Sequence, residues 1–256
     1  MSLIHKSLIA SALLGASFAA QAITPIDTSS TPNEGFSGTV GLGLSGESGS
    51  KDEQEYSVSL LGRHVAGERT ALLIVNYNYG ETDDKKDEDD LFVHGRWIKN
   101  NFFSERFDWE NFVQYEYDKF DDLNSRKLAG TGVRWRFASE TETGLLNTTF
   151  GVGGFVEEEE SESTGETESN WRGNFYGKWV WNRKGDFPFE LYGRMYLQPV
   201  LDDLGDLRAT ANGGIKFGLT EAMSLSFDAE VEYDSEPFEE AEKTNTEYGV
   251  KLSYAF

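Results

Sequence analysis

The sequence contains no cysteine, which excludes disulfide bonds and thiol chemistry from its fold and its function. Beyond the first 22 residues it has no apolar run near the roughly 18 to 20 residues that a transmembrane helix needs. Basic residues are scarce as well, with 23 Lys and Arg against 45 Asp and Glu and a net charge of −22. We expect no nucleic-acid binding, because phosphate contacts need clustered Lys and Arg.

The start of the chain has the features of an export signal. His5 and Lys6 give it a basic start, an apolar stretch covers 8–18, and Ala20 and Ala22 form the small-x-small pattern of a cleavage site. An exported chain without a long apolar helix can span a membrane only with β-strands. We predict three segments: a signal peptide over 1–22, a short periplasmic segment over 23–34 and a membrane-embedded domain over 35–256.

The last ten residues alternate between apolar and polar side chains. A period of two is typical of a strand with one face toward lipid and the other toward a polar lumen. The closing aromatic residue resembles the C-terminal signal that the barrel-assembly machinery of bacterial outer membranes reads. We therefore expect this machinery as a partner of the strand, with lipid and lipopolysaccharide against its apolar face. The predicted assembly signal consists of Tyr248, Val250, Leu252, Tyr254 and Phe256, and the opposite face carries Glu247, Gly249, Lys251, Ser253 and Ala255.

Acidic residues are concentrated in six segments that alternate with short, nearly neutral ones. The six segments hold 28 acidic residues against 6 basic ones, which is nearly the whole charge imbalance. Six acidic loops and five turns separate twelve strands, and an even strand number matches single-chain outer-membrane barrels. The predicted loops cover 47–53, 81–90, 118–126, 157–168, 201–206 and 234–243, and the predicted turns lie near 66–69, 101–105, 139–143, 184–186 and 219–222.

The rest of the chain supports this fold class. The 27 glycines and 35 aromatic residues suit barrel walls and interfacial aromatic belts. Trp109, Val113 and Tyr115 alternate with polar residues, and so do Phe175 and Trp179. We predict an all-β protein: a single antiparallel transmembrane barrel of about 12 strands in the bacterial outer membrane, with short periplasmic turns and longer acidic extracellular loops.

Strand alternation also predicts which charged residues face the lumen. Their signs tend to switch between neighbouring strands, as opposite charges that pair across strands do. Two alternatives follow: ion pairs fill a narrow interior, or the charges line a small water-filled pore and select solutes. The candidate lining consists of Arg63, Arg96, Asp108, Glu110, Arg134, Arg136, Arg172, Lys178, Glu190, Arg194, Arg208, Lys216, Asp228, Glu230, Glu232, Glu247 and Lys251, accompanied by His94 and Glu116.

Catalysis is not predicted. A Ser-His-acid site needs a histidine next to a nucleophile. After the leader the chain has only His64, expected to face lipid or the membrane interface near a periplasmic turn, and His94, expected in the lumen. Neither lies near a G-x-S-x-G-like segment, so we expect no enzyme and no cofactor.

A defined metal site is not predicted either. The acidic runs within 81–90 and 157–162 offer oxygen ligands, but no EF-hand or nonapeptide spacing is present. A run of like charges is more often a solvated loop. We expect at most diffuse divalent cations at these loops, and an acidic vestibule that gives an open lumen a weak cation preference.

Several stretches resemble the salt-induced outer-membrane proteins of Gram-negative bacteria of the YdiY type, a family of unknown function. They are 75–80, 101–106, 232–237, 243–246 and the closing residues 254–256. The resemblance covers roughly 35–256. It implies an outer-membrane location and a link to osmotic or salt stress, and it brings no functional residue. We therefore expect passage of small solutes or ions; the alternative is a non-conducting structural or interaction barrel with acidic loops.

Overall fold

The computed structural model describes residues 34–47, 52–237 and 242–255. The predicted signal peptide lies outside the described residues, as does the segment after it up to residue 33. In the part of the chain that is described, no helix is long and apolar enough to cross a membrane.

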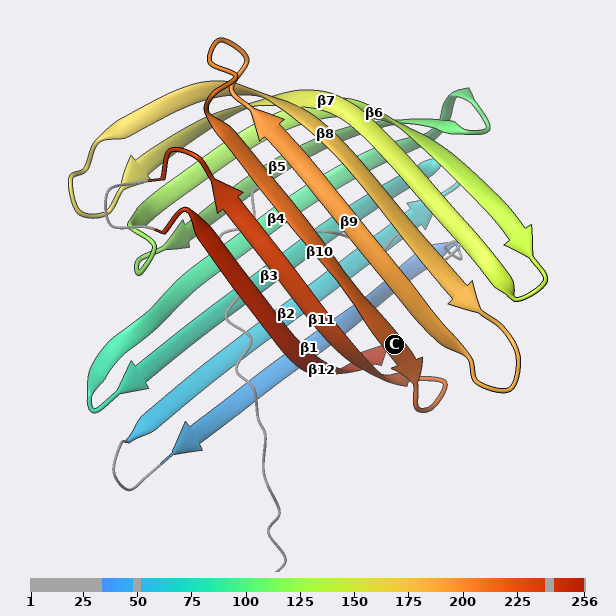
Figure 1. The fold of residues 1–256 in the computed structure, drawn as a ribbon, viewed down its shortest axis with the longest axis horizontal. Coiled ribbons are helices and arrows are strands. Elements are labelled where there is room, and N and C mark those ends of the chain that lie inside the picture. Colours follow the sequence, from blue (N-terminus) through green and yellow to red (C-terminus); the bar gives the residue numbers. More distant parts are fainter. Residues whose placement is uncertain (1–33, 48–51, 238–241, 256) are drawn as a thin grey trace, which may run out of the picture.

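The described residues form strands throughout, joined by short connections (Figure 1). The strands, in chain order, are β1 (Gly35–Glu47), β2 (Glu53–Ala66), β3 (Arg69–Thr82), β4 (Lys85–Ser104), β5 (Phe107–Asp118), β6 (Leu123–Thr141), β7 (Gly144–Ser161), β8 (Thr167–Arg183), β9 (Phe189–Pro199), β10 (Leu207–Gly218), β11 (Met223–Asp234) and β12 (Thr244–Ala255).

These twelve strands make one closed antiparallel barrel, in which each strand pairs with its neighbours in the sequence. The first and last strands close it, with Thr39 opposite Ala255 and Val40 opposite Tyr254. In Figure 1 the strands β9–β12 cross in front of β1–β5 at a large angle, as the strand tilt of a barrel requires. The predicted fold class and strand number are confirmed.

Alternation along each strand separates two environments. Val113, Phe175, Met195 and Phe227 point outward and are exposed on the barrel surface. On β5 the intervening positions are almost completely buried, from Asp108 through to Glu116. Because successive side chains of a strand point to opposite faces, the charges are inside and an apolar band is outside.

The connections divide between two ends of the barrel, here called the turn end and the loop end. At the turn end, 67–68, 105–106 and 142–143 are tight turns, and 184–188 and 219–222 are slightly longer. Each overlaps a predicted turn, although β4 and β6 extend into the predicted turns 101–105 and 139–143. Gly67 has a φ of 56°, a left-handed conformation that glycine adopts without strain.

At the loop end, the predicted extents of three acidic loops are wrong: of 118–126 only 119–122 connect strands, and two others are shorter still relative to their predicted length. In the segment 81–90 only Asp83 and Asp84 connect strands, and the remainder belongs to β3 and β4. In 157–168 the strands leave only 162–166 as a loop. The reason is that alternation sends every second acid inward to a partner: Asp90 accepts a hydrogen bond from Asn78. The acids therefore lie in strands with partners, and neither 81–90 nor 157–168 forms a long solvated loop.

Candidate functional site in the barrel lumen

At the loop end of the lumen, two glutamates of β7 lie among three arginines. Arg172 and Arg208 both bind Glu157, and Arg126 and Arg208 both bind Glu159. The distances from Arg208 are 3.0 Å to Glu157 Oε2 and 2.6 Å to Glu159 Oε2. All five side chains are buried. We call these five residues the arginine–glutamate cluster; the pairing of opposite charges is what allows so many of them to be buried together.

Aspartates at the mouth hold the outer side of this cluster. Asp206 receives both terminal nitrogens of Arg172, at 2.8 and 3.0 Å, in the bidentate geometry that favours Arg–carboxylate pairs. Asp234 accepts from Arg208 Nε at 2.7 Å. The loop 200–206 is thereby fixed over the cluster, and Val200 inside it is buried.

A chain of hydrogen bonds leads from the cluster toward the middle of the lumen. Arg126 binds Glu116, and Gln114 Nε2 donates to Glu116 at 2.9 Å. Gln114 also meets His94 Nδ1 at 2.9 Å, and Arg96 Nε donates to His94 Nε2 at 3.3 Å. His94 is thus held between Gln114 and Arg96, and this arrangement indicates a structural role for its ring.

The chain continues to a carboxylate shared by two strands. Arg96 Nη1 lies 3.5 Å from Glu110 Oε2, and Tyr176 donates its hydroxyl to Glu110 Oε1 at 2.8 Å. Nearer the turn end, Asp108 lies 2.7 Å from Arg134 Nε and 2.8 Å from Arg136 Nε. The ion pairs join the neighbouring strands β4, β5 and β6 by opposite charges, and the Tyr176 hydroxyl joins β8 to β5 across the lumen.

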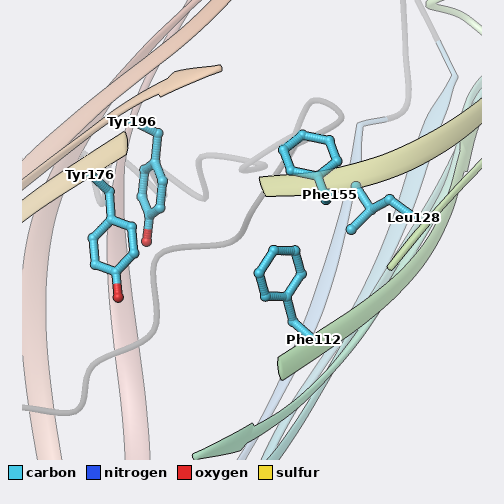
Figure 2. Close-up of a cluster of buried hydrophobic side chains, with 5 residues drawn as sticks. All are labelled: Phe112, Leu128, Phe155, Tyr176 and Tyr196. Atoms are coloured by element: carbon cyan, nitrogen blue, oxygen red, sulfur yellow. The ribbon is translucent and has the colours of Figure 1, made fainter. Parts of the chain in front are cut away.

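Aromatic side chains fill the lumen beside the charges. Phe112, Leu128, Phe155, Tyr176 and Tyr196 form one buried cluster from five consecutive strands, here called the aromatic layer. Figure 2 shows the two tyrosine rings side by side, with Phe112 and Phe155 facing each other further along the wall. Their ring centroids are 5.3 Å and 6.2 Å apart, respectively. Together with the charges, this layer packs the β4–β9 side of the barrel.

Glycines opposite the aromatic layer provide its space. A Cβ on Gly130 would come within 2.3 Å of Phe112 Cζ, and one on Gly151 within 2.1 Å of the Tyr176 ring. Both contacts are far shorter than side chains tolerate. The glycine-rich composition of β6 and β7 therefore serves packing inside the barrel as well as strand geometry.

The other side of the lumen has a different lining. Thr39, Ser57 and Ser59 on β1 and β2 are small, polar and only partly buried. Asp228 and Glu230 of β11 are also half-buried, as is Glu232. The interior is thus lopsided: large side chains fill one wall, while small residues and acids line the other.

The loop-end mouth opens into a cavity of about 290 Å³. Its floor includes Arg126, Arg172 and Arg208, which are already paired, and most of its remaining charged lining is acidic. Within the described ranges, no group of three or more His, Asp or Glu residues is arranged to hold a metal ion.

The structure places most of the sequence-predicted lining inside the barrel, but in distinct groups. Arg96, Asp108, Glu110, Arg134, Arg172 and Arg208 belong to the buried networks, and Arg136, whose side chain is 40% exposed, contacts Asp108 at their edge. Lys216 lies 3.9 Å from Glu190 on β9. Half-buried positions are held by Arg63, Lys178, Arg194, Asp228, Glu230 and Glu232. The side chains of Glu247 and Lys251 lie outside the described residues.

The C-terminal residues are described in part. Tyr248 and Val250 are exposed on the outer surface of β12. The side chains of Leu252, Tyr254 and Phe256 lie outside the part of the chain that the structure describes. Near the turn end, His64 stacks on the exposed ring of Phe36 with centroids 4.2 Å apart.

Sequence reasoning missed Arg126, Glu157 and Glu159 because they sit in segments assigned to loops. If the alternation of β7 is extended by four residues, over 157–160, both glutamates fall on the inward face. The aromatic layer was missed for another reason: inward positions were searched only for charges. Phe112 and Phe155 share the inward parity of Glu110 and Glu157.

A family model described as "Protein of unknown function, DUF481" matches residues 40–256. No curated protein matches the chain. Among solved structures it is similar to the NanC porin, with 10% identity, a TM-score of 0.48 and coverage of 85% of this chain and 98% of that one. It is also similar to the beta domain of the Bordetella autotransporter BrkA (10% identity, TM-score 0.42, 86% and 97% covered). A third is the translocator domain of the autotransporter NalP from Neisseria meningitidis (11%, 0.41, 88% and 90%).

Proposed function

Because the chain belongs to the DUF481 family of proteins of unknown function, its role must be derived from its own geometry, and we propose that it is an outer-membrane barrel that passes small solutes or ions along a narrow path with weak cation preference. The path follows the half-buried wall formed by β11, β1 and β2. No catalytic role is part of this proposal.

The outward face supports the membrane location. It carries exposed aromatic and aliphatic side chains, including Val113, Phe150, Phe175 and Phe227. Exposing such a band to water would be costly, and lipid removes that cost. We further propose lipid and lipopolysaccharide as surroundings, and the assembly machinery as the partner of the strand ending 254–256. A role in osmotic or salt stress follows from the family resemblance alone.

The observation that carries the proposed selectivity is the surplus of acidic residues around the cavity at the loop-end mouth. Arg126, Arg172 and Arg208 line this cavity, but they are buried and each binds two or more carboxylates. Most of the other charged residues of the lining are acidic, among them Glu168, Glu232 and Glu236. Water at the mouth therefore meets more acidic than basic surface, which concentrates cations.

The test is the reversal potential across a planar bilayer that separates a tenfold KCl gradient. We expect single-channel steps and a potential of the sign set by potassium, which declines as both salt concentrations rise. The triple variant Asp228→Asn, Glu230→Gln, Glu232→Gln should reduce the cation preference. A control triple variant removes the same number of exposed charges at the turn end: Glu142→Gln, Asp186→Asn and Glu221→Gln. A wild-type preference for chloride would overturn the selectivity proposal.

The aromatic layer favours a second candidate function, a non-conducting structural or interaction barrel. In that case the packed side chains would close the lumen, and the acidic mouth would serve as a surface for partners. The same recording separates the two candidates. Absence of current from a protein that circular dichroism shows to be folded would favour the non-conducting barrel.

A further inference from the structure

We propose that the lumen contains a binding subsite for small zwitterions, formed by Arg194 for the carboxylate and by Glu230 with Asn212 for the cationic group. The inference rests on the proposed passage and names the solute class that it would favour. It comes from a row of residues that backbone pairing places side by side.

The row runs across four strands. Lys178 on β8 lies opposite Arg194 on β9, Arg194 opposite Asn212 on β10, and Asn212 opposite Glu230 on β11. All four occupy inward positions and are half-buried, so their side chains are accessible from the lumen. The row is basic at one end and acidic at the other, with a neutral amide between.

Arg194 differs from the arginines of the packed wall. Arg96, Arg134 and Arg208 each have a carboxylate within 4.0 Å, whereas Arg194 makes no ion pair with any described residue. Its Nε is buried and has no hydrogen-bond partner among the described residues. The guanidinium carbon instead lies 5.4 Å from the ring centroid of Tyr192. The Arg194 side chain is half-buried, and its buried N–H group has no acceptor among the described residues. Such a guanidinium is suited to bind a carboxylate, with which it forms strong hydrogen bonds.

Asn212 has the complementary feature, an acceptor atom without a hydrogen-bond partner among the described residues. Its Nδ2 donates to Glu230 Oε2 at 2.8 Å, which fixes the amide orientation, while its Oδ1 is buried without a partner in the described structure. Oδ1 can only accept a hydrogen bond. An ammonium group placed there would donate to Oδ1 and be attracted by Glu230 at the same time.

The spacing decides between one solute and two separate ions. Arg194 and Glu230 are two strand intervals apart, which is about 9–10 Å between backbones. Both side chains reach into the lumen and shorten that span. One small molecule carrying both charges can therefore contact both ends, and it satisfies the orphaned donor and the orphaned acceptor together. A lone chloride or potassium ion would satisfy one of them.

The experiment measures binding to the refolded full barrel in detergent micelles by saturation-transfer NMR. The probes are 4-aminobutyrate, butyrate and butylammonium, which share a carbon chain and differ only in their charged ends. We expect 4-aminobutyrate to bind at least fivefold more tightly than either half-probe. Arg194→Gln should weaken binding of 4-aminobutyrate and butyrate, and Glu230→Gln should weaken binding of 4-aminobutyrate and butylammonium. Lys127→Gln and Glu158→Gln, on the outer surface near the loop end, are the matched controls.

Equal binding of all three probes to the wild-type barrel would overturn the inference, and so would 4-aminobutyrate binding that neither lumen variant changes. The comparison of probes on the wild type stands even if a variant does not fold. Conductance is recorded in parallel. Current without selective zwitterion binding would refute the subsite and leave the passage proposal intact, whereas selective binding without current would do the reverse.

Discussion

The guanidinium of Arg208 on β10 lies 2.6 Å from the carboxylate of Glu159 on β7, so this ion pair connects strands that are not neighbours in the sheet. Backbone hydrogen bonds join each strand only to the next. A contact across the lumen therefore adds a constraint that the sheet itself lacks, and it braces the barrel against flattening.

The first prediction concerns this brace. Glu159→Gln leaves Arg126 and Arg208 buried with one carboxylate fewer, and loss of one partner from a buried ion pair costs about 3–5 kcal/mol. We expect the free energy of unfolding to fall by that order in urea titrations of the lipid-embedded barrel, followed by tryptophan fluorescence.

The matched control is Glu158→Gln, one residue earlier on the same strand. Glu158 points outward and meets Lys127 at 3.2 Å, with both side chains more than half exposed. Such a pair contributes about 0–1 kcal/mol. Equal effects of the two substitutions would show that the arginine–glutamate cluster does not brace the barrel.

The second prediction concerns the space that glycine leaves for the aromatic layer. Gly151→Ala would place a methyl group 2.1 Å from the Tyr176 ring, so the ring must move. Overpacking of this kind costs about 1–3 kcal/mol. Gly177→Ala is the control, because its nearest neighbour, Phe150 Cδ1, would lie at an ordinary 3.5 Å. The measurement is the urea midpoint of each variant; a Gly151→Ala midpoint equal to that of the wild type would contradict the packing.

The third prediction addresses what limits the lumen. Phe155→Ala removes a ring that is 1% exposed and packs against Phe112. If the aromatic layer narrows the path, single-channel conductance should rise severalfold. Phe150→Ala, on the same strand with its ring exposed outward, should leave conductance unchanged. Unchanged conductance in both variants would place the constriction elsewhere.

The fourth prediction concerns the loop 200–206. Asp206→Asn weakens the bidentate contact with Arg172, which charge assistance makes one of the stronger hydrogen-bonded pairs. We expect amide hydrogen exchange in 200–206 to accelerate by about tenfold, a loss of roughly 1.4 kcal/mol of local stability. Asp202→Asn, an exposed residue of the same loop, should change little. Similar exchange rates in the two variants would mean that Asp206 does not fasten the loop.

Much of the fold could be read from the sequence because its causes are local. Outward residues such as Phe175 and Phe227 follow a period of two, and turns need only a few residues. The outline of the lumen followed from the same parity, since Asp108 and Glu110 must face away from lipid. The alternation, however, shows only whether a side chain points inward or outward, and it does not show which residue that side chain contacts. It could not show that Glu190 is the residue near Lys216, because that choice depends on the register between β9 and β10.

The sequence by itself thus determined the class of barrel, its twelve strands and the inward face of strand charges such as Asp108 and Glu110, because alternation and turns are properties of consecutive residues. Only the tertiary structure decided that Glu157 and Glu159 are buried partners of arginines, and that Arg194 has no such partner among the described residues. Closure of the barrel brings residues of distant strands such as β7 and β10 together across the lumen. Which charges then neutralise one another depends on distances that the order of the chain does not contain.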